Sequence, residues 1–203
     1  MVEDHSILIS SVGGQGGITL ARILSSAAMG MELNVRVGEN LGMAQRGGSV
    51  SSHVRIGGRV YGPSISRGGA DVVLSLEPAE ALKAIEYIGK QTKVIVNTAP
   101  SVPSSMVLGQ STYPKLDEIV ATLKEATEEV YTLDATGLAR EAGTTRSLNV
   151  VALGAYMALG EGVLTIDSVK TAIAGSVPAR YLEQNMKAFE LGLTQMNKAM
   201  SEV

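Results

Sequence analysis

The 203-residue chain contains no cysteine, and this absence excludes several classes of redox and metal protein. Iron–sulfur clusters are held mainly by cysteine thiolates, so the chain cannot hold an ordinary cluster by itself. Thiol nucleophiles, redox disulfides and zinc ribbons are excluded for the same reason. Histidine occurs only at His5 and His53, which are far apart in the sequence. A single histidine among scattered carboxylates does not predict a transition-metal site. We therefore expect no metal site in this chain.

Aromatic residues, excess positive charge and long apolar runs are also scarce. Aromatics make up 3% of the chain, so its core must be built from Leu, Ile, Val, Ala and Met. The net charge of −3 and the pI of about 5.5 argue against a nucleic-acid partner. No apolar stretch approaches the ~20 residues that span a bilayer. The acidic N-terminus, Met1–His5, is not followed by an apolar signal core. We expect a cytoplasmic protein that binds neither nucleic acid nor membrane.

The N-terminal pattern predicts a strand, a tight loop and a helix. The apolar run Ile7–Ser11 leads into a cluster of four glycines and one glutamine, Gly13-Gly14-Gln15-Gly16-Gly17. Residues 18–24 then carry apolar side chains at helical spacing, and Gly30 is a suitable C-cap. A second strand is expected over Asn34–Val37.

Residues 49–56 alternate as a half-buried strand does. One face carries Val50, Ser52, Val54 and Ile56, and the opposite face carries Ser51, His53 and Arg55. Two glycines follow at positions 57 and 58. They predict a hairpin turn into an antiparallel partner strand over 59–61.

The rest of the chain alternates strands with helices and then becomes helical. Strands are expected over Asp71–Leu76, Lys93–Asn97 and Glu129–Leu133, and helices over 78–88, 149–159, 166–174 and 179–200. This order predicts a doubly wound α/β fold with a mainly parallel sheet and helices on both faces. It also includes an antiparallel hairpin and a helical C-terminal part. Without a repeat or a low-complexity linker, residues 1–203 are expected to form a single domain.

The first glycine cluster suits close approach of an anion to main-chain amides at a helix N-terminus. The dinucleotide fingerprint fits it imperfectly, because Thr19 stands where the third glycine belongs when counting starts at Gly14. Glu39 lies about 20 residues on, where a ribose-binding acid would stand, but beyond the end of the expected strand. A ligand- or anion-binding loop and a purely structural turn both remain open for Gly13, Gly14, Gln15, Gly16 and Gly17.

A second glycine-rich segment carries a family resemblance. Residues 42–50 (GMAQRGGSV), running into Ser52–Gly57, resemble the signature of the gamma-type domain of 2-oxoacid:ferredoxin oxidoreductases. Companion segments agree in order and spacing, and together they span nearly the whole chain: Gly13–Gly17, Gly69–Pro78, Val94–Asn97, Asp134–Thr136 and Asn149–Ala155. Residues 42–48 are similar to the indolepyruvate branch, whereas the pyruvate branch carries a more charged segment that ends in a single glycine.

The resemblance implies a small subunit without redox chemistry of its own. The family's reaction is oxidative decarboxylation of an aryl 2-oxoacid with coenzyme A to aryl-acyl-CoA, carbon dioxide and reduced ferredoxin. Thiamine diphosphate and iron–sulfur clusters would reside on a large catalytic partner subunit, with coenzyme A and ferredoxin as co-substrates of the complex. The chain also lacks the Gly-Asp-Gly segment typical of thiamine diphosphate sites. We therefore expect no catalytic residue in this chain, and no activity from it alone.

Six residues are candidates for contact with substrate or with the partner subunit: Gln45, Arg46, Gly47, Gly48, His53 and Arg55. Arg46 could pair with a carboxylate or phosphate in bidentate fashion, or be an ordinary surface arginine or a cross-subunit ion pair. His53 could transfer protons, or be a hydrogen-bonded interfacial histidine.

Other positions and other functions remain open. Asn97 and Asp134 fall at strand C-termini, where ligands bind in open sheets, but capping explains both equally well. The apolar stripe of the last helix is expected to pack on the chain's own sheet: Leu182, Met186, Phe189, Leu193 and Met196. Alternative functions are the gamma subunit of a pyruvate or other 2-ketoacid ferredoxin oxidoreductase, a stand-alone nucleotide-binding Rossmann-like protein, and a non-enzymatic binding domain.

Overall fold

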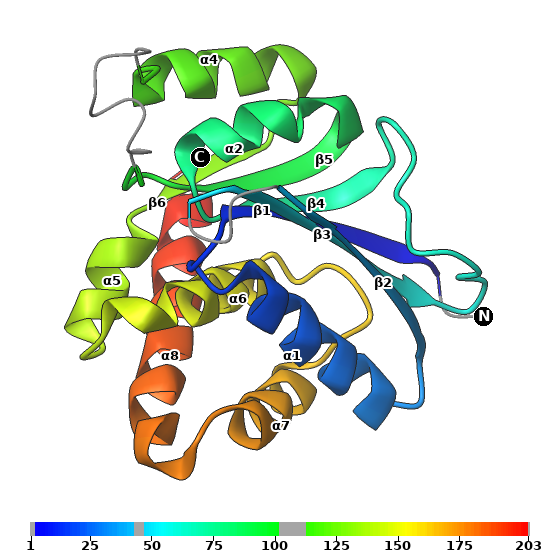
Figure 1. Ribbon diagram of the computed structural model, residues 1–203, viewed down its shortest axis with the longest axis vertical. Helices are drawn as coiled ribbons and strands as arrows, with labels where there is room; N and C mark the ends of the chain where they lie inside the picture. Colours follow the sequence, from blue (N-terminus) through cyan, green and yellow to red (C-terminus); the bar gives the residue numbers. More distant parts are fainter. Residues whose placement is uncertain (1–2, 43–46, 102–112, 203) are drawn as a thin grey trace.

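A computed structural model describes residues 3–42, 47–101 and 113–202. Six strands form one sheet in the order β2-β3-β1-β4-β5-β6 (Figure 1). The strands are β1 (His5–Val12), β2 (Asn34–Leu41), β3 (Ser49–Gly57), β4 (Ala70–Ser75), β5 (Ile88–Asn97) and β6 (Val130–Leu133). The helices are α1 (Gly17–Gly30), α2 (Pro78–Lys83), α4 (Leu116–Ala126), α5 (Ala135–Glu141), α6 (Leu148–Ala158), α7 (Ile166–Ser176) and α8 (Leu182–Ser201). Short 3-10 turns are η1 (Ile85–Tyr87), η2 (Thr145–Ser147) and η3 (Ala179–Tyr181).

Strands β1, β4, β5 and β6 run parallel, and β3 runs antiparallel between β1 and β2. The four parallel strands therefore all end at one edge of the sheet, which we call the carboxyl edge. Within the sheet, β3 and β2 lie beyond one edge of β1, and β4, β5 and β6 lie beyond its other edge. Between β1 and β4 the strand order changes direction, and open α/β sheets bind ligands at such a point.

The antiparallel part differs from the expectation. Residues 59–61 form no strand, so the predicted hairpin after Gly57 is wrong. Both edges of β3 are already paired, to β1 on one side and to β2 on the other, and no edge remains for a further strand. The antiparallel hairpin is instead formed by β2 and β3. Strand β2 also continues to Leu41, so Glu39 lies within this strand and not beyond its end.

Helices cover both faces of the sheet, which confirms the expected fold class. Helices α1, α6, α7 and α8 lie on one face, and α2 and α4 on the other (Figure 1). The alternation along β1 explains this layering, because Ile7 and Ile9 join the core under α1 and α6 while Leu8 joins the core under α2 and α4. Within residues 3–42, 47–101 and 113–202, no helix is both long and apolar enough to cross a bilayer.

The C-terminal helices pack more closely than their periodicity indicates. Helix α8 lies mainly against α6. The expectation that its apolar stripe packs directly on the sheet is therefore wrong. A side chain at Gly154 would overlap the main chain of Phe189, and one at Gly192 would overlap that of Val151. The two glycines thus bring the helix backbones together. Helix α6 is apolar on all sides except at Asn149 in its first turn, and it is buried between its neighbours.

Candidate functional site

The candidate site lies at the carboxyl edge, where the glycine loop after β1 meets the first residues after β4. Gly14 (φ 104°) and Gly16 (φ 85°) have left-handed backbone conformations that favour glycine. Gly16 is the N-cap of α1, and its carbonyl oxygen accepts a hydrogen bond of 3.2 Å from Asn149 Nδ2. A Cβ atom at Gly16 would lie 2.8 Å from the same nitrogen. The loop is therefore shaped by contacts with α6, which the sequence does not reveal.

Gln15 closes the point at which the strand order changes direction. Its Oε1 accepts a hydrogen bond of 3.0 Å from the Val12 amide, and its Nε2 donates one of 3.1 Å to the Leu76 carbonyl. The side chain thus bridges the ends of β1 and β4, in the crevice where Rossmann-type proteins bind a dinucleotide. Together with Thr19 at the third glycine position, this bridge weighs against a nucleotide site here.

The two glycine-rich segments lie side by side. The Gly13 amide donates to the Gly48 carbonyl at 2.8 Å, and the Gly47 amide donates to the Gly13 carbonyl at 3.3 Å. Two segments predicted separately from the sequence therefore form one continuous surface. Gln45 and Arg46, the two side chains singled out in the second segment, lie outside the described residues.

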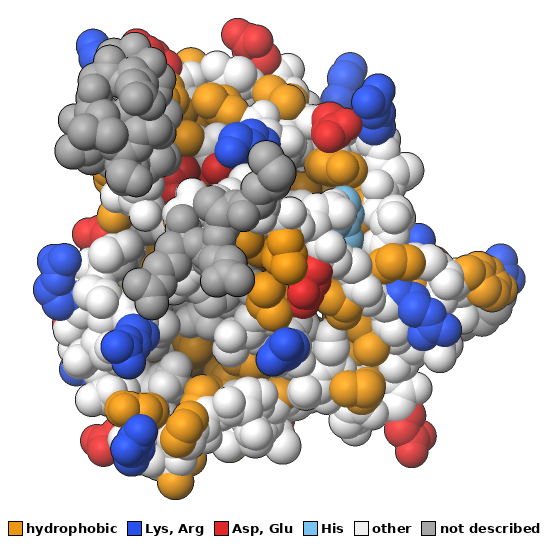
Figure 2. Space-filling view, viewed as in Figure 1, with side chains coloured by type: hydrophobic (Ala, Val, Ile, Leu, Met, Phe, Trp, Pro, Cys, Tyr) orange, Lys and Arg blue, Asp and Glu red, His pale blue; other side chains and the backbone are white. Residues whose placement is uncertain are grey.

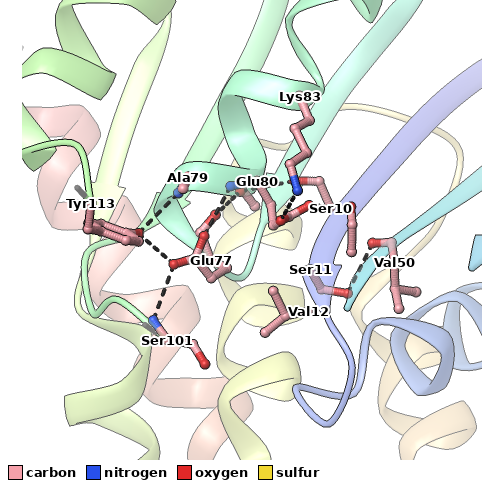
Figure 3. A network of polar contacts seen from close by, with 12 residues as sticks. Ser10, Ser11, Val12, Val50, Glu77, Ala79, Glu80, Lys83, Ser101 and Tyr113 are labelled. Carbon is pink, nitrogen blue, oxygen red and sulfur yellow. Dashed lines mark hydrogen bonds and ion pairs between the residues drawn. The ribbon is translucent and has the colours of Figure 1, made fainter. Parts of the chain in front are cut away.

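Two buried carboxylates on α2 organise the same edge (Figure 3). Glu77 Oε1 accepts hydrogen bonds from the Tyr113 hydroxyl at 2.5 Å and from the Ser101 amide at 3.2 Å. Its Oε2 accepts from the Glu80 amide at 3.0 Å, so Glu77 is also the N-cap of α2. Burial and the neighbouring Glu77 carboxylate raise the pKa of Tyr113 further above its ordinary value, in agreement with a hydroxyl that donates to this carboxylate.

Glu80 ties α2 to the start of β3. Its carboxylate accepts a hydrogen bond from the Ser49 hydroxyl and, at 2.6 Å, one from Lys83 Nζ. Sequence reasoning missed Glu80 and saw Glu77 only as the start of a helix. The signal available was an acid at the N-cap followed by an acid three residues later, as in a capping box. That pattern predicts the helix start, but not the partners Tyr113 and Ser49.

Asn97 and Asp134 act within the fold. Asn97 is buried at the end of β5, and its Nδ2 donates to the Leu76 carbonyl at 2.9 Å and to Thr136 Oγ1 at 3.2 Å. Asp134 accepts a hydrogen bond of 2.8 Å from the Gly137 amide and is the N-cap of α5. The capping interpretation of Asp134 is confirmed, and Asn97 joins the ends of β4 and β5 to α5.

The open polar face expected on β3 is wrong at His53, which is 4% exposed. Its Nδ1 accepts a hydrogen bond of 3.3 Å from the Ile65 amide, and the Tyr87 ring stands edge-on at 5.1 Å between centroids. Burial lowers the pKa of His53 and Glu86 opposes this in part, so the ring favours its neutral form. The segment between β3 and β4 thus covers a face that the alternation alone leaves open.

Arg55 is separated from the glycine loops. Ser49, at the start of β3, pairs with the end of β1, whereas Arg55 pairs with Ser6 near the start of β1. Six residues of extended strand correspond to roughly 20 Å. Arg55 donates to the Ser6 hydroxyl at 3.3 Å and lies 3.9 Å from the Asp4 carboxylate. The structure therefore places Gly47 and Gly48 beside the loop Gly13–Gly17. His53 and Arg55 lie farther along β3, away from this loop.

Curated relatives match almost the whole chain. An indolepyruvate oxidoreductase subunit IorB from Archaeoglobus fulgidus is 42% identical over 190 residues, covering 94% of each chain. The subunit of the same name from Pyrococcus horikoshii is 42% identical over 193 residues, covering 95% of this chain and 96% of that one. A pyruvate synthase subunit PorC from Methanocaldococcus jannaschii is 28% identical over 193 residues, covering 92% and 93%.

Solved structures share the fold. The gamma subunit of a keto/oxoacid ferredoxin oxidoreductase from Geobacter sulfurreducens superposes with a TM-score of 0.71 at 24% identity, covering 96% of this chain and 99% of that one. A 2-oxoglutarate:ferredoxin oxidoreductase from Magnetococcus marinus gives 0.74 at 21% identity, covering 97% of this chain and 31% of that one. The sequence profile described as pyruvate ferredoxin/flavodoxin oxidoreductase matches residues 6–195, and the chain belongs to this family.

Proposed function

We propose that this chain is the small subunit of a cytoplasmic, indolepyruvate-type 2-oxoacid:ferredoxin oxidoreductase. The observation that carries the proposal is the 42% identity to two indolepyruvate oxidoreductase subunits over nearly full length. Relatives named for pyruvate are less similar, at 28% for the Methanocaldococcus subunit and 30% for a Pyrococcus abyssi gamma subunit. The complex would convert an aryl 2-oxoacid and coenzyme A to aryl-acyl-CoA and carbon dioxide, and pass the electrons to ferredoxin.

In this proposal a larger partner subunit carries the reactive cofactors. The residues of this chain do not fit an iron–sulfur cluster, because the chain has no cysteine thiolate to bind the iron. The Gly-Asp-Gly segment that accompanies thiamine diphosphate is also missing. Residues 1–203 would act as a single domain whose part is to bind and orient the partner.

The surface proposed for that contact is the joined pair of glycine segments, Gly13–Gly17 and Gly47–Gly48. The main chains of the two segments meet there, and Gly14 and Gly47 are exposed, which allows close approach of another backbone or of an anionic group. Arg46 directly precedes Gly47, and we propose that its guanidinium pairs with a carboxylate or phosphate of the assembled complex.

Reconstitution with the large subunit of the same organism tests the proposal. Co-expression with a tag on this chain should yield one coloured complex that reduces ferredoxin when indolepyruvate and coenzyme A are supplied, and more slowly with pyruvate. The separate chain should be colourless and inactive. Failure of the two subunits to associate, or a clear preference for pyruvate, would contradict the proposal.

Arg46→Ala tests the contact surface within the same complex. Exposed substitutions usually change stability by less than about 0.5 kcal/mol, so the melting temperature should hardly change. Affinity for the large subunit, or turnover of the complex, should fall about tenfold, and lysine should restore only part of it if the contact is bidentate. Wild-type assembly and turnover in the alanine variant would remove Arg46 from the interface.

A further inference from the structure

The two edges of the sheet differ in how well they are protected. Strand β2 pairs only with β3, and all of Asn34–Leu41 runs in register with β3 without a bulge. At the opposite edge β6 has only four residues, and α8 packs against it. Proteins usually protect an edge strand by shortening or covering it, or with proline, lysine or a bulge. Strand β2, which is described in full, contains no proline or lysine and is a long, open edge.

The hydrogen bonds between β2 and β3 show which main-chain groups reach the free edge. The Gly42 amide donates to the Ser49 carbonyl at 2.7 Å, so the main-chain groups of Gly42 point toward β3. Along an antiparallel strand these groups point alternately toward the neighbouring strand and away from it. The odd-numbered residues of β2 therefore present their amides and carbonyls at the free edge: Val35, Val37, Glu39 and Leu41.

We propose that two copies of this chain pair antiparallel through β2, about a two-fold axis at Gly38, so that their sheets join into one. A two-fold axis requires one residue of the strand to lie opposite its own copy. With Gly38 at the axis, Val37 lies opposite Glu39 of the second copy. Val35 then lies opposite Leu41, so every outward residue exchanges main-chain hydrogen bonds with another outward residue. This inference does not depend on the proposed subunit role.

The side chains of β2 favour this register over its neighbours. An axis at Arg36 or at Glu39 would place that charge opposite its own copy, which is unfavourable. An axis at Gly38 instead places Arg36 opposite Asn40, and no side chains stand between the two strands at the axis itself. In the single chain Arg36 donates to the Val35 carbonyl at 2.9 Å. Pairing exchanges this bond for one from a main-chain amide of the second copy.

Pairing would also cover exposed apolar side chains. Leu41 is 63% exposed and Val37 is 38% exposed, and Met29 of α1, which lines a groove together with Val37, is 60% exposed. Figure 2 shows hydrophobic side chains over α1 and β2, with a few charged ones between them. An axis at Gly38 sets Leu41 beside Val35 of the second copy, which removes apolar surface from water.

Sedimentation velocity and hydrogen exchange of the full chain test the association. A monomer of 21.1 kDa should shift toward twice this mass as the protein concentration rises. The amides of Val37 and Glu39 point to the free edge, so they should exchange fast in the monomer and become protected in the dimer. The Gly38 amide points toward β3 and should be protected at every concentration, which makes it the internal control.

Two substitutions of opposite charge at one position test the register. Val37→Lys places a lysine opposite Glu39 of the second copy, so the dimer should form at least as well as in wild type. Val37→Glu places two acidic side chains opposite each other, twice by symmetry, and should weaken the dimer about tenfold. Val37→Thr keeps the shape without a charge and is the matched control. If the axis lay at Val37 itself, both charged variants would weaken the dimer alike.

Val37→Pro tests the main-chain contacts. Proline removes an amide that points to the free edge and leaves the hydrogen bonds between β2 and β3 in place, so the monomer should stay folded while the dimer is lost. Melting curves show whether each variant is folded. The inference is overturned if the wild-type chain stays monomeric at millimolar concentration, or if both charged variants weaken the dimer alike. It is also overturned if the β2 amides become protected only when the large subunit is added, because a strand of that subunit would then occupy the edge.

Discussion

The two ends of β1 differ in whether the buried polar side chains nearby have hydrogen-bond partners. At the carboxyl edge, Gln15, Glu77 and Asn97 each satisfy main-chain groups of neighbouring elements. At the amino end, His5 Nε2 and the Tyr156 hydroxyl are buried and have no hydrogen-bond partner among the described residues. The two rings lie 6.0 Å apart between centroids. At the amino end the Asp71 carboxylate accepts a hydrogen bond of 2.7 Å from the Ser6 amide and lies 3.7 Å from His5 Nδ1, but the two buried ring groups stay unpaired among the described residues.

This contrast shows where the fold is specified in detail. Strand ends leave main-chain groups that need partners, and at the carboxyl edge side chains from other elements supply them. The same contacts set the shape of the glycine loop proposed to meet the partner subunit. At the amino end, burial lowers the pKa of His5 and raises that of Tyr156, so both groups stay neutral.

Among the substitutions that test this difference between the two ends of β1, Glu77→Ala is expected to lower the free energy of unfolding most. The substitution leaves the Tyr113 hydroxyl and the Ser101 amide without this acceptor, and the Glu80 amide keeps only the Glu77 main-chain carbonyl at 3.2 Å. Unfolding free energy should fall by about 3 kcal/mol, because buried donors without partners cost about 1–3 kcal/mol each. Urea unfolding measures this loss. Glu125→Ala, at an exposed position of α4, is the matched control and should be near neutral. Equal small losses in both would mean that the Glu77 contacts are not formed.

Gly16→Ala should cost about 2 kcal/mol. A side chain at φ 85° is strained by about 1–2 kcal/mol, and its Cβ would press on Asn149. Gly30→Ala is the matched control, because open space surrounds Gly30 and alanine favours helix. Thermal unfolding of both variants gives the comparison. If the two changes had the same effect, the glycine loop would be a permissive turn.

Tyr156→Phe tests the amino end of β1, where the expected change in stability has the opposite sign. It removes a buried hydroxyl that has no partner among the described residues and keeps the ring. Stability should stay constant or rise by up to about 1 kcal/mol, because desolvation of the hydroxyl is avoided. Denaturant unfolding is sufficient to measure this. A loss above about 1 kcal/mol would show that the hydroxyl is hydrogen-bonded in solution.

The smallest expected effect is a pH dependence from the two histidines. Burial lowers the folded-state pKa of both His5 and His53 below the ordinary value of 6.5. As the pH falls below 6.5, the unfolded chain takes up protons that the folded chain does not, so stability decreases. Above 6.5 neither histidine contributes. The melting temperature should therefore be lower at pH 5.5 than at pH 7.5, and His5→Gln and His53→Gln should each flatten this slope. An unchanged slope in both variants would contradict the assignment.

Local signals in the sequence predicted much of the fold. The apolar run of β1, the glycine turn into α1, the cap at Asp134 and the three C-terminal helices were found within a few residues of their observed bounds. Each depends on side-chain periodicity or on a capping residue, which act over one or two turns of chain. The family resemblance came from the same local segments, and the comparisons confirm it.

Only the tertiary structure decided which distant residues meet. Strand β3 lies between β1 and β2, and this removed the expected hairpin. His53 is buried because the segment between β3 and β4 and the Tyr87 ring cover its face. The Gln15 bridge to Leu76 and the Asn149 contact with Gly16 join residues 61 and 133 positions apart. No periodicity encodes such pairs, because a glutamine or an asparagine in a loop is compatible with many partners. The choice among those partners is made when the strands pair and the helices pack, and the main-chain groups left at strand ends then select the side chains within reach.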